Sequence, residues 1–582
     1  MRNARGNAFV LLLALVFAFA GGLLAYLVQT DYGNVRVDQV RFAADDGRIV
    51  NARLYRPANA SADAPAPAVL AVHGYINHEG TQAPYAIELS RRGYVVLAID
   101  QPGHGYSDPP AFAGGFGGID GLAYLRSLPF VDLDQVVLSG HSMGGWAALI
   151  AAAVNPDGYT SVVVSGSSTG TFGAPEGTPT FPRNLGLVFG AFDEFSQLMW
   201  GSATGEGILR TAKLQALFGS DGPVAPGVTY GSIDDGTARW LAMPVQTHPM
   251  NHITTAGVAP VIDWVQRTTT APFPLPPEDQ VWMWREAGTG LGLLGFFLAL
   301  FGVSSSLLGT PAFGALRLRV PPAAGLSGFG WWLGAAIAAA IPALTYFWAT
   351  AEAAQRLPAS RLFPQAITSE IMGWALVNAA ITLVLVLLWW ATAGRRRGAR
   401  ADTLGLPVGG FLRAIVFAFV VVGGAHALLA LVGGVFQVDF RLWVVAQKLL
   451  SQDQLLIALR YVLPFTLFFL VFGLLLHGQL RPADSRAEGA DAMIANALIA
   501  VGGFVVLLLV QYLPVVTAGQ PITILEPLRT IVAYQFIVLL PVAAMLSTYL
   551  FARTGSVWPG AWVNGFWVTA YIVASQATQF AG

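Results

Sequence analysis

The chain lacks cysteine and carries little charge. Without cysteine it has no disulfide framework, no thiolate nucleophile and no cysteine-ligated metal site. Only 11% of the 582 residues are charged and 54% are hydrophobic, whereas a soluble globular protein carries roughly 25% charge. Lysine occurs only at Lys213 and Lys448, and no basic run alternates with aromatic residues as in nucleic-acid-binding surfaces. The composition excludes a purely soluble protein and gives no sign of nucleic acid binding.

The net charge of −1 conceals two different halves. Residues 30–285 carry 23 acidic and 14 basic side chains, while residues 286–582 carry 10 acidic and 16 basic ones. The first segment has the length of one large α/β domain. The second consists of long apolar stretches separated by short loops, so it needs a lipid environment.

Apolar stretches long enough to cross a bilayer need roughly 20 helical residues. The first, residues 8–28, follows Arg2 and Arg5 and is longer than the core of a cleaved signal peptide, so we interpret residues 1–29 as an uncleaved anchor. The proline-rich stretch 271–286 is typical of a stiff linker. Residues 287–582 then hold eight predicted spans, at 287–308, 329–351, 371–394, 414–435, 455–477, 493–513, 530–551 and 561–580.

The positions of the arginines indicate how the predicted spans are oriented in the membrane, because cytoplasmic loops near span ends are enriched in basic residues. With a cytoplasmic N-terminus, the inner loops hold Arg317, Arg319, Arg395, Arg396, Arg397, Arg400, Arg481, Arg486 and Arg553. Residues 30–270 are then extracytoplasmic in a multi-pass protein of a bacterial-type plasma membrane. No Asp or Glu lies deep in a predicted span, so a pump or ion-coupled transporter is weakly supported.

Strand and helix patterns alternate in the segment 30–270. After a predicted hairpin over 37–56, apolar runs at 66–72, 94–99, 135–139, 159–165, 185–189 and 239–246 are separated by helical stretches or loops. This order predicts a mostly parallel sheet with helices on both faces. Reactive groups are expected at the carboxyl ends of its strands.

One serine has the surroundings of a nucleophile. Ser142 is the centre of Gly140-His141-Ser142-Met143-Gly144, which matches the Gly-x-Ser-x-Gly nucleophile elbow. It lies between an apolar strand and a helix that begins with small residues, as the tight turn requires. A second match, centred on Ser168, leads into a loop. The pattern therefore favours Ser142.

A serine nucleophile needs a base and a carboxylate that orients the base, in the chain order Ser, acid, His for this kind of elbow. Asp193 follows a predicted strand and is the expected acid, with the adjacent Glu194 as the alternative and the two aspartates at 234 and 235 as weaker ones. His252 directly precedes the last amphipathic helix and is the preferred base. His248, in the same loop, is the alternative.

The oxyanion of an acyl-transfer reaction needs preorganised backbone donors. We expect the N–H of Met143, which follows the nucleophile, and the N–H of Tyr75, which follows the first parallel strand. His78 and Glu79 do not form a zinc motif, since no second histidine follows at the required spacing.

Residues 36–268 resemble the α/β-hydrolase superfamily. The resemblance rests on His73-Gly74-Tyr75, the turn 100–107, the Ser142 elbow, Asp193 and His252, and it covers about 40% of the chain. It implies a hydrolase similar to dienelactone-hydrolase-like esterases or prolyl-oligopeptidase-like peptidases, with no cofactor and no metal.

The segments that could cover the site differ from those of this superfamily. Such enzymes often insert a helical cap after the sixth strand, but only the Gly/Pro/Thr-rich segment 167–182 is available here, and the longer insertion 196–236 lies between acid and histidine. We therefore hypothesise that the membrane bundle or residues 196–236 cover the site and admit lipid-like acyl substrates.

A weaker resemblance concerns the last spans. Residues 553–559 are similar to a segment of CAAX-protease-like membrane proteins, whose paired glutamates and catalytic histidine are absent here. Asn564 stands about where that histidine would be, so the resemblance implies a region that has lost this activity.

Together these features predict a membrane-embedded serine hydrolase that cleaves ester bonds of small-molecule or lipid-like substrates through an acyl-enzyme. A serine peptidase or amidase of the same fold is one alternative. A transporter or membrane scaffold with a non-catalytic sensing domain is another, and an intramembrane protease is disfavoured by the missing charged residues. The sequence leaves the natural substrate and the oligomeric state open.

Overall fold

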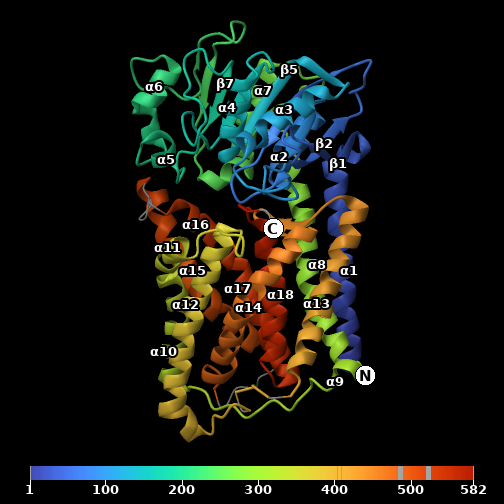
Figure 1. Cartoon of the computed structure of the whole chain (residues 1–582), viewed down its shortest axis with the longest axis vertical. Helices are drawn as coiled ribbons and strands as arrows, with labels where there is room; N and C mark the ends of the chain where they lie inside the picture. The colour runs from blue at the N-terminus through green and yellow to red at the C-terminus, as the bar shows by residue number, and fades with distance from the viewer. Residues whose placement is uncertain (1, 403, 408, 483–488, 520–525, 581–582) are drawn as a thin grey trace.

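The N-terminal half is built around a mixed sheet that lies at one end of an elongated molecule (Figure 1). The computed structural model describes residues 2–402, 404–407, 409–482, 489–519 and 526–580. Within them, nine strands form this sheet in the order β1-β2-β4-β3-β5-β6-β7-β9-β8. Their bounds are β1 (Val35–Ala43), β2 (Ile49–Pro57), β3 (Ala66–Val72), β4 (Val95–Ile99), β5 (Val131–His141), β6 (Ser161–Ser165), β7 (Leu185–Val188), β8 (Thr229–Tyr230) and β9 (Arg239–Ala242).

The centre of the sheet is parallel, from β4 through β3, β5, β6 and β7 to β9. The hairpin β1–β2 and the short β8 are antiparallel additions at its two edges. Because strand β3 alternates its side chains between faces, Leu70 and Val72 pack toward α3 (Gly118–Ser127) and α4 (Met143–Val154). Val69 and Ala71 pack toward α2 (Ala83–Arg91) and α7 (Thr255–Thr268). The predicted fold, a mostly parallel sheet with helices on both faces, is confirmed.

Helices, most of them long and apolar, make up the other part of the molecule (Figure 1). They are α1 (Arg2–Gln29), α8 (Trp282–Leu308), α10 (Gly328–Leu344), α11 (Tyr346–Arg356), α12 (Ala366–Trp389), α13 (Phe411–Phe436), α14 (Gln452–Leu474), α15 (Ala490–Ala518), α16 (Pro527–Ala533), α17 (Phe536–Thr554) and α18 (Trp558–Ser575). In the described part of the chain, seven spans qualify by length and composition to cross a membrane, or eight if the bent pair α10–α11 counts as one. The chain is therefore a candidate multi-pass membrane protein.

The last predicted span, 561–580, falls mainly on α18, which is not among these seven or eight. Most residues of α18 are buried by neighbouring helices, and it packs against α13, α14 and α17. A helix in the centre of a bundle has little lipid contact, so its surface does not have to be as apolar as that of an outer helix.

The first and second spans, α1 and α8, form the most extensive helix pair of the bundle. A side chain at Gly21 of α1 would collide with the backbone of Gly288 and Gly292 of α8. Small residues allow such close approach of helices in a membrane. The α/β domain is inserted between these two helices, and both run from it along the bundle (Figure 1).

Polar contacts fix the α/β domain against the bundle. Arg53 of β2 donates to the carbonyl oxygen of Gln437, beyond α13, at 2.9 Å. Gln454 of α14 donates to the carbonyl oxygen of Gly105 at 2.9 Å. The N–H of Thr578 donates to the carbonyl oxygen of Gly103 at 2.8 Å. These contacts involve three separate regions of the bundle, so they hold the domain in one orientation.

Candidate active site

The turn at Ser142 has the strained backbone of a nucleophile elbow. Ser142 joins β5 to α4 with φ +56° and ψ −122°, in the region that non-glycine residues rarely adopt. A side chain at Gly140 would collide with the backbone of Gly144, and one at Gly144 would collide with the carbonyl of Val72. The two glycines therefore let the turn fit against β3, and Ser142 lines a cavity beyond the strand ends.

Asp193 forms a hydrogen-bonded pair with His248. Asp193 lies in the loop after β7, and His248 begins the short 3-10 helix η5 (His248–His252). The Nδ1 atom of His248 is 2.9 Å from Oδ2 and 3.1 Å from Oδ1 of Asp193, and both side chains are buried. Burial alone lowers the pKa of His248, but the charge and hydrogen bond of Asp193 outweigh it and raise the pKa. The pair has the geometry of a base oriented by a carboxylate.

The structure pairs Asp193 with His248 and not with His252, the base preferred from the sequence. The His252 ring packs on His141, with ring centroids 4.2 Å apart, and among the described residues neither of its ring nitrogens has a hydrogen-bond partner. Burial lowers the pKa of His252 to about 3. The physical reason is the tight turn of η5, which directs the first histidine, and not the last, toward Asp193.

Glu194, the alternative acid, binds the backbone of His248. Its Oε2 accepts from the N–H of His248 at 2.7 Å, and its Oε1 accepts from the hydroxyl of Tyr512 on α15 at 2.7 Å. Burial and the neighbouring charge of Asp193 raise the pKa of Glu194 to about 7. Glu194 therefore links a membrane helix to the histidine loop.

The expected oxyanion donors, Tyr75 and Met143, both line the cavity beside Ser142. Within the described residues, no backbone hydrogen bond uses the N–H of either residue. A Cβ at Gly74 would lie 3.0 Å from the Cβ of Ser142, so the loop after β3 passes directly beside the elbow. Both N–H groups are available near the serine.

The weaker candidates lie elsewhere. Ser168 is buried, and its hydroxyl is 2.8 Å from that of Thr171. Asp234 and Asp235 are exposed in the loop before β9. None of these three residues is among the described residues that line the cavity.

The cavity has a volume of about 630 Å³ and is mostly apolar. This volume lies within the usual range of small-molecule sites. Its wall comes from both halves of the protein. The hydrolytic candidates Ser142, Met143 and His248 share it with His141, His252, Gly74, Tyr75, Ile76, Asn77, Phe112, Phe116, Trp146, Phe172, Phe195, Leu198, Met199, Pro249, Trp443, Val444, Leu528 and Ile531.

The bundle residues in this wall were not predicted from the sequence. Trp443 and Val444 lie at the turn of a hairpin, β10 (Phe440–Leu442) and β11 (Val445–Gln447), that connects α13 to α14. One signal was available: this short loop carries Asp439, Arg441 and Lys448 in a half of the chain with little charge. Such a concentration of charge between two spans indicates a contact with another polar surface.

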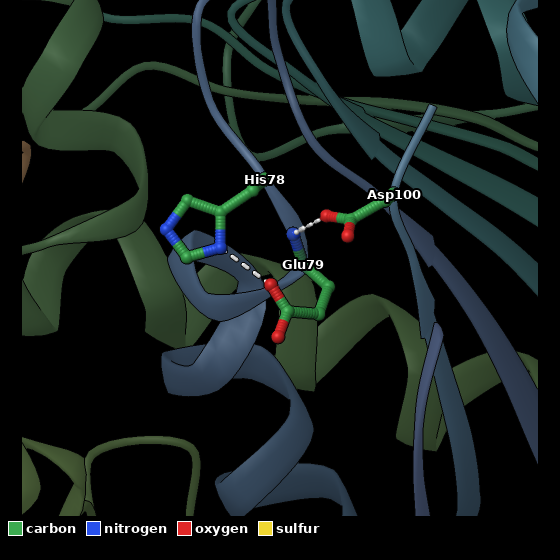
Figure 2. A group of neighbouring side chains, drawn as sticks. All are labelled: His78, Glu79 and Asp100. Carbon is green, nitrogen blue, oxygen red and sulfur yellow. Dashed lines mark hydrogen bonds and ion pairs between the residues drawn. The ribbon is translucent and has the colours of Figure 1, made fainter. Parts of the chain in front are cut away.

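His78, Glu79 and Asp100 form a buried cluster that could offer one ligand atom each to a metal ion (Figure 2). Asp100 Oδ1 accepts from the N–H of Glu79 at 2.8 Å, and Oδ2 accepts from Asn51 Nδ2 at 2.7 Å. Glu79 also pairs with Arg53 at 3.1 Å, and His78 contacts Arg441 of β10.

Guanidinium groups border this cluster, and its carboxylate oxygens already accept hydrogen bonds. Its chemistry is therefore that of an ion-pair network, and the two arginines fit it better than an added cation. Because Arg441 comes from the bundle, the network also joins the two halves.

Comparison with known proteins identifies the N-terminal half. The family model described as serine aminopeptidase, S33, matches residues 63–190, which include β3 to β7 and the Ser142 elbow. Together with the parallel sheet and the strained serine turn, this match decides the fold class. The N-terminal half of the chain contains an α/β-hydrolase domain.

The curated relatives align over a short part of this hydrolase domain. A 2-hydroxy-6-oxononadienedioate/2-hydroxy-6-oxononatrienedioate hydrolase of Cupriavidus pinatubonensis is 38% identical over 78 residues, which is 13% of this chain and 27% of the relative. A similarly named hydrolase of Dechloromonas aromatica is 31% identical over 102 residues, 18% of this chain and 35% of the relative. The chain thus spans about a third or less of the length of either relative.

Among solved structures, esterase LipW from Mycobacterium marinum is 17% identical, with a TM-score of 0.32 over 44% of this chain and 87% of that one. The resemblance to CAAX-protease-like proteins finds no support in these comparisons. Asn564 is buried in α18, donates to the carbonyl oxygen of Ala543 at 2.9 Å and accepts from Trp567 at 2.9 Å. Its contacts are those of a residue that joins helices.

Proposed function

We propose that the protein is a membrane-embedded serine hydrolase that cleaves esters through an acyl-enzyme on Ser142. One observation carries the proposal: His248, which is hydrogen-bonded to Asp193, and the strained Ser142 turn line the same cavity. In this chain they follow one another as serine, acid and histidine, which is the chain order typical of the α/β-hydrolase fold.

The reaction has two acyl-transfer steps. His248 removes the proton of the Ser142 hydroxyl as its oxygen attacks the ester carbonyl, while Asp193 stabilises the imidazolium. The N–H groups of Tyr75 and Met143 bind the oxyanion. His248 then donates its proton to the leaving alcohol, and water, deprotonated by His248, releases the acid and restores the serine.

The cavity favours an ester over the peptide or amide alternative. An aminopeptidase has to hold a charged amino group, but no Asp or Glu is among the described residues of the cavity wall. The curated relatives are named for a dienedioate, a dianion, yet no Lys or Arg lines the wall in the described part of the chain. An uncharged ester with an apolar acyl group fits this wall best, because a buried charge needs a partner.

Activity-based labelling of the full-length protein tests the proposal. We expect a fluorophosphonate probe to label folded wild-type protein and an ester to be hydrolysed faster than its matched amide. Absence of labelling in folded wild-type protein would overturn the proposed function, and would favour a binding or sensing role for the domain.

The pH dependence should respond to the charge of Glu194. Ionised Glu194 helps to raise the pKa of His248, and neutral His248 is the active base. Glu194→Gln keeps an oxygen for the N–H of His248 but removes the charge, so the pKa of His248 falls. We expect the acid limb of the kcat/KM profile to move to lower pH.

The variant Tyr512→Phe should act in the same direction. It removes a donor that favours the charged form of Glu194, so the pKa of Glu194 rises further and the carboxyl group stays neutral to higher pH. If both variants lost activity but kept the pH profile of the wild type, Glu194 would have only a structural role.

For the topology, we propose that the hydrolase domain is extracytoplasmic in a bacterial-type plasma membrane. The arginine-bearing loops contact one another: Arg397 donates to the carbonyl oxygen of Gly325, whose N–H donates to Arg481. The N-terminus and α9 (Pro311–Gly314) lie at the end of the bundle remote from the hydrolase domain (Figure 1). Of the inner-loop arginines, Arg486 lies outside the described residues.

A protease added to intact cells should cut within residues 196–236, because this insertion is exposed on the hydrolase domain. The same region should resist a protease enclosed in right-side-out vesicles. Protection in intact cells, with cleavage after lysis, contradicts the orientation.

A further inference from the structure

The hydrolase domain does not complete the cavity by itself. Trp443 and Val444 of the β10–β11 hairpin and Leu528 and Ile531 of α16 supply part of the wall. Three of these four side chains are large and apolar, and the fourth, Val444, is apolar too. The part of the site that would hold an apolar substrate group therefore belongs in part to the bundle.

This arrangement is held by contacts close to the cavity. The Tyr512 hydroxyl binds Glu194, and the Tyr512 ring stacks on Tyr534, just after α16, with ring centroids 5.6 Å apart. Trp443 contacts the same Tyr534 ring, with centroids 5.3 Å apart. The hairpin, α15 and α16 thus form one packed unit against the two loops that carry Asp193 and His248.

The hydrolase side of the cavity has an apolar rim. Phe112, Phe172 and Leu198 line the cavity although they are 46%, 63% and 50% exposed. Large exposed apolar side chains grouped at one opening indicate an interaction with another apolar phase. Met250 and Val245, in the histidine loop and just before it, are also exposed.

The rim lies close to where the bundle begins. The helix α5 (Ser196–Trp200), which carries Leu198, faces α16 across the boundary between the two halves (Figure 1). The helix α16 begins the span 527–554. An acyl chain in the adjacent leaflet is therefore the apolar phase nearest to the rim.

We propose that the substrate is an uncharged acyl ester lipid taken from the leaflet beside the hydrolase domain, with its acyl chain held between α5 and α16. This inference rests on the proposed function. The carbonyl carbon lies at Ser142, and the chain extends along Leu198, Leu528 and Ile531. His252, whose buried ring nitrogens have no partner among the described residues, faces the cavity as a polar group for a hydroxyl beside the ester.

Acyl-chain selectivity of the full-length protein tests the inference. Esters of one alcohol with acetyl, octanoyl and palmitoyl groups are compared for wild type, Ile531→Trp and the control Ile494→Trp, whose position on α15 is 54% exposed and outside the cavity. We expect Ile531→Trp to lower the palmitoyl-to-acetyl ratio of kcat/KM by about tenfold or more, since a few methylene groups in a pocket are worth that much. Ile494→Trp should keep the wild-type ratio.

The source of the substrate is tested by placing the palmitoyl ester either in the vesicles that contain the protein or in separate vesicles. We expect hydrolysis in the first arrangement and little in the second. Equal rates in both arrangements overturn entry from the leaflet, and an unchanged chain-length ratio in Ile531→Trp overturns the role of the bundle.

These outcomes are distinguishable from failure of the proposed function. Fluorophosphonate labelling of Ile531→Trp shows that the variant is folded and that Ser142 is reactive. If wild type is labelled and cleaves the acetyl ester, but Ile531→Trp has the same chain-length ratio as wild type, the hydrolase proposal stands and the lipid inference fails.

Discussion

Ser142→Ala should abolish fluorophosphonate labelling and lower ester turnover by roughly 10⁴- to 10⁶-fold, the size of effect that loss of a serine nucleophile has in other hydrolases. Without the hydroxyl no acyl-enzyme forms, and only binding and the oxyanion donors remain. The strained backbone at Ser142 supports this expectation, because such conformations persist where the surrounding structure enforces them.

The matched control for this variant is Ser168→Ala. Ser168 is the centre of the second Gly-x-Ser-x-Gly match, but it is buried and bonded to Thr171. We expect it to keep labelling and most activity. Labelling that survives in Ser142→Ala and disappears in Ser168→Ala would transfer the nucleophile to the second motif.

His248→Ala should lower kcat by about 10⁴-fold, the magnitude associated with loss of a correctly oriented base. His252→Ala should lower it by less than about tenfold, since its ring nitrogens have no partner among the described residues and one neutral hydrogen bond to a substrate is worth about 1 kcal/mol. The two residues belong to the same short helix η5, so they form a matched pair with similar burial. The measurement is the single-turnover rate of acylation with an activated ester.

Asp193→Asn provides an independent check of the same pair. The substitution keeps the shape of the side chain but changes the hydrogen bond to His248 Nδ1. We therefore expect it to lower kcat by about as much as His248→Ala does. Should His252→Ala be the inactivating change while His248→Ala stays active, the buried pair in the structure would not be the catalytic one.

Most of the hydrolase fold could be predicted because its signals are local. Apolar runs separated by helices indicate a parallel sheet, and the structure has parallel pairing from β4 to β9. The predicted hairpin over 37–56 is the β1–β2 pair. Asp193 could be proposed as the acid for the same reason, since it lies in the loop after β7.

Which of His248 and His252 pairs with Asp193 could not be predicted from the sequence. The two residues are four positions apart in one loop, and both precede α7. What separates them is the tight 3-10 turn of η5, whose direction depends on the packing of the loop after β9. A sequence pattern contains the histidines but not the direction of that turn.

The cavity wall and the Glu194–Tyr512 contact were also missed, for a different reason. Ser142 and Ile531 lie almost 400 positions apart, and Glu194 and Tyr512 more than 300. Contacts of this kind depend on how the bundle docks on the sheet, and single-sequence periodicity carries no information about it. The charged hairpin loop near Arg441 was the one local hint.

The close pairing of α1 with α8 constrains the order in which the protein assembles. The hydrolase domain and most of the linker after it, residues 30–281 together, separate the two helices in the chain, so their contact closes a very long loop. During synthesis α1 must therefore remain without its main partner until the hydrolase domain and α8 have been made. A domain that folds early brings the ends of α1 and α8 together and shortens that loop. Slow folding of the hydrolase domain would therefore delay closure of the helix pair and leave the small-residue face of α1, with Ala14, Ala18, Gly21 and Ala25, without its partner.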